Sequence, residues 1–200
     1  MDDDQVPLLV DPALPVGSLR VLKQPCLTVD DHLVLRPWHS DDAPAVMGAF
    51  AQPDIQRWHV RRIDSEAEAR DWIGGWSRHW DRESDASWAI ARTDDHAIGQ
   101  VGLRTIMLFA AQAQMSYWVL PDARGARVAA RATRALTQWA FDTLGLHRLF
   151  LMHSTANPAS CRVALNAGFQ PEGTMRGYTL HTDGWHDMHM HGRLRTDVAD

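Results

Sequence analysis

Two segments carry the residue types best suited to chemistry, and each lies where a predicted strand runs into a predicted helix. In the first, "YWVLPDARGARVAARATRAL", a loop with Arg124, Gly125 and Arg127 precedes the helix. The free N–H groups at a helix start bind phosphate, and a glycine lets the backbone approach an anion closely. Arginines add donors that match phosphate geometry. The segment therefore indicates either a phosphate-binding loop or a basic helix start on the surface.

The second segment, "NPASCRVALNAGFQPEG", places an amide and a hydroxyl at another helix start. Asn157 ends a predicted strand, Pro158 opens the helix, and Ser160 lies in its first turn. A hydroxyl at this position can donate to a developing anion. Asn157 could equally be an ordinary N-cap and Ser160 an ordinary first-turn residue. The residues alone leave both interpretations open.

The C-terminal segment "WHDMHMHG" offers metal ligands. Alternation along a strand puts Asp187, His189 and His191 on one face, and this set could bind zinc or a similar ion. The pattern signals no fourth ligand, and the two cysteines, Cys26 and Cys161, are far apart and not in metal-type spacing. Structural or solvent-facing histidines are therefore expected, with no metal.

Length and composition predict one soluble domain. The chain has 200 residues, of which 45% are hydrophobic and 22% charged, with a net charge of −5. This acidic balance argues against non-specific nucleic-acid binding. The first residues are acidic where a signal peptide would be basic, and no apolar run approaches membrane-spanning length. A cytoplasmic protein with reduced cysteines and no membrane partner is expected.

Periodicity and turn residues predict the element order βααβββαβαββ, an α/β domain with a mixed sheet. A proline-bearing arm, residues 1–30, is expected to lie on a domain that spans residues 31–197. Strands are predicted at 32–38, 87–92, 97–109, 113–120 and 147–154, with a final hairpin around a turn at 182–184. Helices are predicted at 40–51, 65–80 with an S-x-x-E capping box, 128–143 and 158–168.

Tryptophan is enriched, with nine in the chain. Trp72, Trp76 and Trp80 recur every four residues and so share one face of a helix. The stripe is either part of the core or, in part, the wall of an acceptor pocket or a subunit contact.

In their order and spacing, the motifs from about Leu33 to Arg195 resemble the GCN5-related N-acetyltransferase (GNAT) superfamily, in particular the branch that includes the RimJ and RimL ribosomal-protein N-terminal acetyltransferases. They are "LVLRPWHSDDA", "AIGQVGL", "YWVLPDARG", "LGLHRLFL", "NPASCRVALNAGFQPEG" and "DGWHDMHMHGRL". The resemblance implies a single GNAT-type domain with a mixed, mostly antiparallel sheet flanked by helices. In this fold a splayed pair of parallel strands forms the acyl-CoA cleft.

The resemblance implies an acetyl-CoA-dependent N-acetyltransferase, which transfers an acetyl group to a primary amine by direct attack in a ternary complex. Asn157 and Ser160 are expected among the catalytic residues. Asn157 would contact the pantetheine region, and Ser160 would lie near the sulfur, where some relatives use this hydroxyl to protonate the departing thiolate. The backbone that would hold the pantetheine arm and the thioester oxygen is that of Trp118, Val119 and Leu120. The amides that would cradle the pyrophosphate are those of Arg124, Gly125, Ala126, Arg127, Val128 and Ala129.

The chain departs from the family pattern in two places. Arg127 occupies a loop position that is normally glycine. Gln114 and Thr179 stand where relatives can carry a glutamate, so the incoming ammonium must lose its proton to another group. The candidates for this base are Tyr178, which we expect among the catalytic residues, and His153, His181, Asp183 and His186.

Other functions remain open from the sequence. The chain could be a non-catalytic domain that binds acyl-CoA or a partner, or a transferase that uses another donor such as succinyl-CoA. The acceptor amine could belong to a protein N-terminus or to a small molecule, because relatives differ most in the acceptor half. Dimers are frequent among relatives, so a homodimer is possible.

Overall fold

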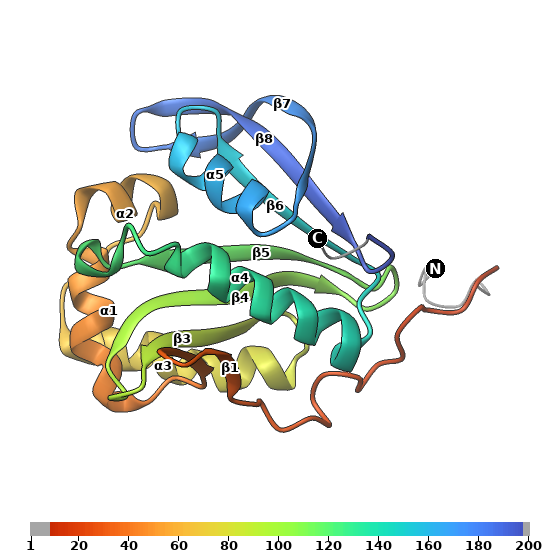
Figure 1. The fold of residues 1–200 in the computed structure, drawn as a ribbon, viewed down its shortest axis with the longest axis horizontal. Helices are drawn as coiled ribbons and strands as arrows, with labels where there is room; N and C mark the ends of the chain where they lie inside the picture. The colour runs from red at the N-terminus through yellow and green to blue at the C-terminus, as the bar shows by residue number, and fades with distance from the viewer. Residues whose placement is uncertain (1–8, 198–200) are drawn as a thin grey trace, which may run out of the picture.

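The computed structural model describes residues 9–197, which form an α/β domain around one eight-stranded sheet (Figure 1). The strand order is β1-β2-β3-β4-β5-β6-β8-β7, and every neighbouring pair is antiparallel except β5 and β6. The strands are β1 (Leu27–Asp30), β2 (Leu33–Arg36), β3 (Ala86–Arg92), β4 (Ala97–Met107), β5 (Gln112–Val119), β6 (Arg148–Ser154), β7 (Gln170–His181) and β8 (Gly184–Leu194). The expected mixed, mostly antiparallel sheet is confirmed.

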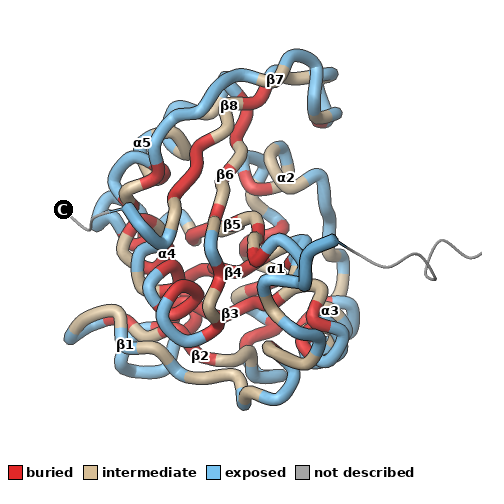
Figure 2. Tube along the Cα trace, turned by 90° about the vertical axis from the view of Figure 1, so that its right-hand side faces the viewer, coloured by how far each residue is buried: buried red, intermediate tan, exposed pale blue. Residues whose placement is uncertain are grey.

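Helices cover both faces of this sheet, as Figure 2 shows from the side. Helices α4 and α5 lie on one face, and α1, α2 and α3 lie on the other. The helices are α1 (Ala43–Phe50), α2 (Pro53–His59), α3 (Glu66–Asp81), α4 (Val128–Trp139) and α5 (Pro158–Asn166). A π-helical turn, Ala140–Leu144, extends α4, and none of the described helices is both long and apolar enough to span a membrane.

Most predicted elements occur close to their expected bounds, and the differences have local causes. The α3 helix begins at the predicted cap, where the Ser65 hydroxyl accepts a hydrogen bond from the Glu68 amide. It runs without a break through Gly74 and Gly75. The sequence analysis missed α2, whose seven residues are too few to show a helical period.

The N-terminal segment is tied to the domain by a buried carboxylate. Glu83 accepts hydrogen bonds from the backbone amides of Gly17 and Leu19 at 2.7 Å and of Arg20 at 3.2 Å. The segment also includes β1, which pairs with β2, so the predicted arm at 1–30 contributes a strand to the sheet. The part of the arm at 1–8 lies outside the described residues.

The parallel pair at the centre of the sheet separates along its length. β5 and β6 are in register from Gln112 with Arg148 to Met115 with Leu151. Both strands continue beyond this point without pairing to each other. The carboxyl-terminal half of β5 therefore has one edge that no strand covers, and the elements that follow both strands meet at this opening.

Candidate active site

A cavity of about 610 Å³ opens where β5 and β6 separate, and we call it the donor cleft. Its floor includes Tyr117, Trp118 and Val119 of β5, and its sides come from the start of α4 and from α5. The predicted site residues that line it are Trp118, Val119, Arg124, Gly125, Arg127, Val128, Ala129, Asn157 and Ser160. Residues separated by up to 42 positions in the sequence, from Trp118 to Ser160, thus share one cavity.

The start of α4 presents backbone amides to this cleft. No side chain among residues 9–197 caps the helix, so its first-turn N–H groups, from Val128 onward, are left for a ligand or water. Gly125 has a φ of +86°, and a β-carbon built there would meet nothing within 4 Å. Free amides at the positive end of a helix fit a phosphate group. The predicted phosphate-binding loop therefore has a backbone geometry suited to that task.

Arg127 is the N-cap of α4 and adopts a left-handed conformation, with φ +55° and ψ +25°. This conformation costs a non-glycine residue roughly 1 kcal/mol or more and costs glycine nothing extra. The backbone therefore explains why glycine suits this position. The arginine side chain is exposed and lines the cleft.

The Arg127→Gly variant distinguishes the contribution of the side chain to ligand binding from that of the backbone. If only the backbone serves the ligand, Arg127→Gly should raise the unfolding free energy by roughly 0.5–1 kcal/mol because the strain is relieved. Its affinity for acetyl-CoA should then be unchanged or higher. Isothermal calorimetry and urea unfolding measure the two quantities. A tenfold loss of affinity, about 1.4 kcal/mol, would instead show that the guanidinium binds phosphate.

Arg124 lines the cleft, but its guanidinium and its backbone amide donate hydrogen bonds to other groups of the protein. Its guanidinium donates to Asp54 of α2 at 2.5 Å and to the Val119 carbonyl at 3.1 Å. Its backbone amide donates to the Pro121 carbonyl. Arg124 therefore holds α2 against the loop, and its amide is not free as the family resemblance implied.

The uncovered edge of β5 supplies further backbone groups. The Leu120 amide donates to Ile98 of β4, so it is engaged in the sheet and points away from the cleft. Because successive residues of a strand face opposite edges, Tyr117 and Val119 face the opening. Of the predicted backbone donors, the Val119 amide is the one with the orientation to serve a bound carbonyl oxygen.

The start of α5 combines a helix cap, Asn157, with a hydroxyl at the donor cleft, that of Ser160. The Asn157 side-chain oxygen accepts a hydrogen bond from the Ser160 amide at 3.1 Å, so Asn157 is an N-cap. The Ser160 carbonyl accepts from the Tyr117 hydroxyl at 3.3 Å, and burial raises the pKa of that phenol. The Ser160 hydroxyl is half-buried at the cleft wall. The cap thus fixes the hydroxyl at the cavity.

A second cavity, of about 420 Å³, lies on the α3 side of β5, and we call it the aromatic cavity. Its aromatic walls are Phe50, Trp72, Trp76 and Trp118. Its charged lining residues are Arg61, Asp71, Arg78, Asp85 and Arg104. The tryptophan stripe is therefore divided, because Trp72 and Trp76 face this cavity while Trp80 packs in the core against Trp88 and Trp139.

Polar groups in the aromatic cavity lack protein partners. Trp76 Nε1 and Ser116 Oγ are buried with no hydrogen bond to any described residue. The Arg104 guanidinium stacks on Trp76 at 4.4 Å and donates only to the backbone carbonyls of Ala86 and Leu103. Burial lowers the pKa of Arg104 to about 10, which leaves it charged at neutral pH. The cavity is therefore equipped to bind a polar molecule.

His59 and Trp118 line both cavities and therefore lie between them. His59 Nε2 lies 3.2 Å from the Tyr117 carbonyl, which can only accept, so Nε2 carries the proton and Nδ1 offers its lone pair. Burial is the main cause that lowers the pKa of His59 to about 4, although the Tyr117 carbonyl opposes it. The ring is therefore neutral at physiological pH.

The base candidates inferred from the sequence lie outside both cavities. Tyr178 is exposed on β7. Asp183 pairs with Arg57 and accepts from His186, while His181 bonds the Arg57 carbonyl. These contacts join the β7–β8 hairpin to α2. His153 belongs to a separate cluster between β6, β8 and α5.

His59 was missed because the α2 helix was missed. The pattern "QPDIQRWHV", with Pro53 at the helix start and an acid in the first turn, carried the signal. The side chain comes close to β5 only because α2 folds back across the end of the sheet, where Arg124 and Asp183 hold it. A sequence pattern does not contain that contact.

Comparison with known proteins agrees with this geometry. A family model described as an acetyltransferase (GNAT) domain matches residues 32–170. The chain is 26% identical over 167 residues to the uncharacterized N-acetyltransferase YoaA of Bacillus subtilis (strain 168). That alignment covers 82% of this chain and 94% of YoaA.

Solved structures share the fold. RimL, a ribosomal alpha-N-protein acetyltransferase in complex with coenzyme A, superposes with a TM-score of 0.77 at 20% identity, over 85% of this chain and 98% of RimL. RimJ of Mycobacterium smegmatis, in complex with CoA-disulfide, gives a TM-score of 0.77 at 21% identity, over 86% of each chain. At these identities the likeness concerns the fold, and at that level the expected resemblance to RimJ and RimL is confirmed.

Proposed function

Because the chain belongs to the acetyltransferase (GNAT) family and is therefore an acyltransferase, we propose that it transfers an acetyl group from acetyl-CoA to a primary amine. The observation that carries the proposal is that two cavities beside β5 share His59 and Trp118 as lining residues. One cavity has free helix-start amides for an anionic donor, and the other has polar groups that lack partners. Two reactants bound in this way would meet beside β5, and such positioning accounts for much of an enzyme's rate.

The donor cleft fits acetyl-CoA by its backbone chemistry. The first-turn amides of α4, with Gly125 and Arg127 before them, would hold the pyrophosphate. Acetyl-CoA would supply a thioester whose carbonyl carbon an amine can attack. The Val119 amide would donate to the thioester oxygen, as fixed donors stabilise a charge that develops there. Ser160 Oγ would donate its proton to the departing sulfur.

His59 would take the proton from the attacking nitrogen. Its neutral ring has a lone pair at Nδ1 and lies between the two cavities. An imidazole with a pKa near 4 is a weak base toward a free ammonium ion, so the acceptor would enter as the neutral amine. The nitrogen becomes strongly acidic as its bond to the acyl carbon forms, and a weak base can then accept its proton.

The aromatic cavity favours an acceptor that carries an amine and an oxygen-bearing group. Trp72, Trp76 and the carboxylates of Asp71 and Asp85 suit a cation that approaches the site. Arg104 has guanidinium N–H groups that could bind a carbonyl or carboxylate. A peptide N-terminus and a small amine with an oxygen substituent both meet these demands.

We propose a cytoplasmic setting, where free thiols such as Cys26 and Cys161 persist.

An acyl-donor by amine activity matrix, read by thiol release, tests the proposal. Acetyl-CoA and succinyl-CoA are offered with peptides and small amines as acceptors. With the best pair, Ser160→Ala should lower kcat on the order of 10²-fold because the thiolate loses its proton donor. The same substitution at Ser77, exposed on α3, should leave kcat unchanged.

The Asn157→Ala variant tests whether the helix cap positions Ser160 for the reaction. Loss of the cap should cost about 1 kcal/mol of unfolding free energy and should lower kcat by misplacing Ser160.

Acetyl-CoA binding without thiol release for any amine would favour a non-catalytic acyl-CoA-binding domain. A preference for succinyl-CoA would keep the enzyme class and change the donor. Absence of both binding and turnover would refute the proposed function.

A further inference from the structure

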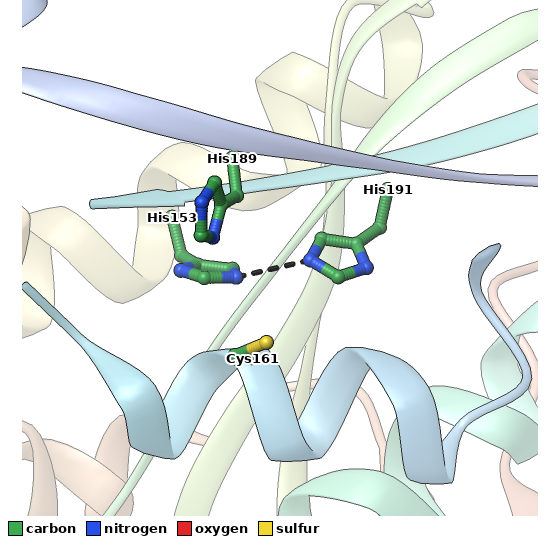
Figure 3. Close-up of side chains that lie close together, drawn as sticks. All are labelled: His153, Cys161, His189 and His191. Carbon is green, nitrogen blue, oxygen red and sulfur yellow. Dashed lines mark hydrogen bonds between the residues drawn. The ribbon is translucent and has the colours of Figure 1, made fainter. Parts of the chain in front are cut away.

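Four potential metal ligands lie close together between β6, β8 and α5. They belong to residues that the proposed acetyl transfer does not use. His153, Cys161, His189 and His191 each offer one ligand atom, and these atoms all lie within 4.8 Å of one another. Figure 3 shows the three rings and the thiol pointing toward a common centre. From this geometry we propose that the four side chains form a zinc site.

The strands bring the histidines together by register. His153 of β6 pairs directly with His189 of β8, so their side chains share one face of the sheet. His191 lies two residues further along β8 and therefore faces the same way. The α5 helix covers this face and directs the Cys161 side chain at the rings (Figure 3).

The distances suit a tetrahedral ion. The Nε2 atoms of His153 and His191 are 3.1 Å apart. Zinc bonds of 2.0–2.1 Å to nitrogen place tetrahedral ligand atoms about 3.3 Å apart. This pair therefore has the required spacing already. All the ligand atoms lie within 4.8 Å of one another, so shifts of at most about 1.5 Å would bring the others to the tetrahedral spacing.

The surroundings of the other ring nitrogens determine which histidine nitrogen can bind a metal. His153 Nδ1 donates to the Ser154 carbonyl at 2.8 Å, which leaves the Nε2 lone pair directed at the cluster. Zinc-binding histidines typically donate their other ring nitrogen in this way. His191 Nδ1 is buried with no hydrogen bond to a described residue. If His191 Nε2 binds a metal, Nδ1 carries the proton.

The ligand set predicts a structural role. Four protein ligands close a tetrahedral site, whereas a catalytic zinc keeps an open position. Imidazole and thiolate together favour zinc over magnesium or calcium, which prefer oxygen. The ion would fasten α5 to β6 and β8. Since Ser160 precedes Cys161 on the same helix, the ion would also fix one wall of the donor cleft.

Metal content and optical spectra of the whole chain test this site. Protein stripped with a chelator is dialysed against Zn²⁺ or Co²⁺, and bound metal is measured by mass spectrometry. We expect one ion per chain, a tetrahedral Co²⁺ spectrum and a cobalt–thiolate charge-transfer band. Zinc at a hundredfold excess over its dissociation constant should raise Tm by roughly 5–10 °C.

Matched variants assign the ligands. Cys161→Ser should abolish the charge-transfer band and weaken metal binding by at least the roughly 10–100-fold that loss of a residue hydrogen-bonded to a ligand causes, whereas Cys26→Ser should change neither. His189→Gln should weaken binding similarly, and His96→Gln, on the loop between β3 and β4, should not. Failure to retain stoichiometric metal would overturn the proposal. So would an octahedral Co²⁺ spectrum, or a spectrum that Cys161→Ser leaves unchanged.

Discussion

A His59→Gln variant is expected to lose on the order of 10²–10⁴-fold in kcat, the range that general bases supply. Glutamine can keep the hydrogen bond that His59 Nε2 donates to the Tyr117 carbonyl, but it has no nitrogen able to accept a proton. The KM for acetyl-CoA should change little, because the α4 amides and the β5 edge remain intact. Steady-state kinetics with a fixed amine measures both parameters.

A histidine from the same cavity provides the control for His59. His79 lines the aromatic cavity but not the donor cleft, and His79→Gln should retain most of the activity. If the two variants lose activity equally, His59 is not the proton acceptor. Partial rescue of a His59→Ala variant by added imidazole would support the proposed role, since a free base can then occupy the vacated space.

The pKa of His59 also predicts a pH dependence of stability. Burial lowers this pKa from 6.5 to about 4, so the unfolded chain binds the proton more readily than the folded protein. The unfolding free energy is unaffected above pH 6.5 and falls as the pH drops toward 4, by roughly 3 kcal/mol for this group. Urea unfolding of His59→Gln and the parent protein across this pH range should show a shallower acid loss in the variant.

The second large effect is expected at Asp42, whose loss would leave a buried cation. Arg36 and Asp42 form a bidentate ion pair at 2.7 and 2.8 Å, and their side chains are 6% and 7% exposed. Burial opposes ionisation, but hydrogen bonds from Arg36 and His39 outweigh it and hold the pKa of Asp42 below its usual value. Arg36 also pairs with Asp95, so Asp42→Asn removes one of its two carboxylate partners and should lower the unfolding free energy by about 2–3 kcal/mol.

Unfolding in urea, with a neighbouring aspartate as control, checks this value. Asp41 is exposed and precedes Asp42, so Asp41→Asn should stay within about 0.5 kcal/mol of the parent. The stabilisation from Asp42 is present above its ordinary pKa of 3.8 and is lost as the pH falls through the lowered value. Equal effects at Asp41 and Asp42 would contradict the assignment to the buried pair.

Local patterns were enough to predict most of the fold. Ser65 and Glu68 mark the start of α3, and Asn157 and Pro158 mark the start of α5, because caps depend on residues a few positions apart. Alternation and apolar runs located the strands for the same reason. The seven residues of α2 were too few to produce a readable period, and β1 lay hidden in a proline-bearing segment.

The sequence by itself predicted the two loops of the proposed donor site, because "DARGAR" and "NPAS" are continuous segments at predicted helix starts. Only the tertiary structure placed His59 between the two cavities and divided the tryptophan stripe between cavity and core. It also joined His153, Cys161, His189 and His191, whereas the alternation along the strand had grouped Asp187 with His189 and His191 and no metal was expected. Asp187 instead accepts a hydrogen bond from Gly177. Contacts between distant segments depend on strand register and helix packing, which local residue patterns do not contain.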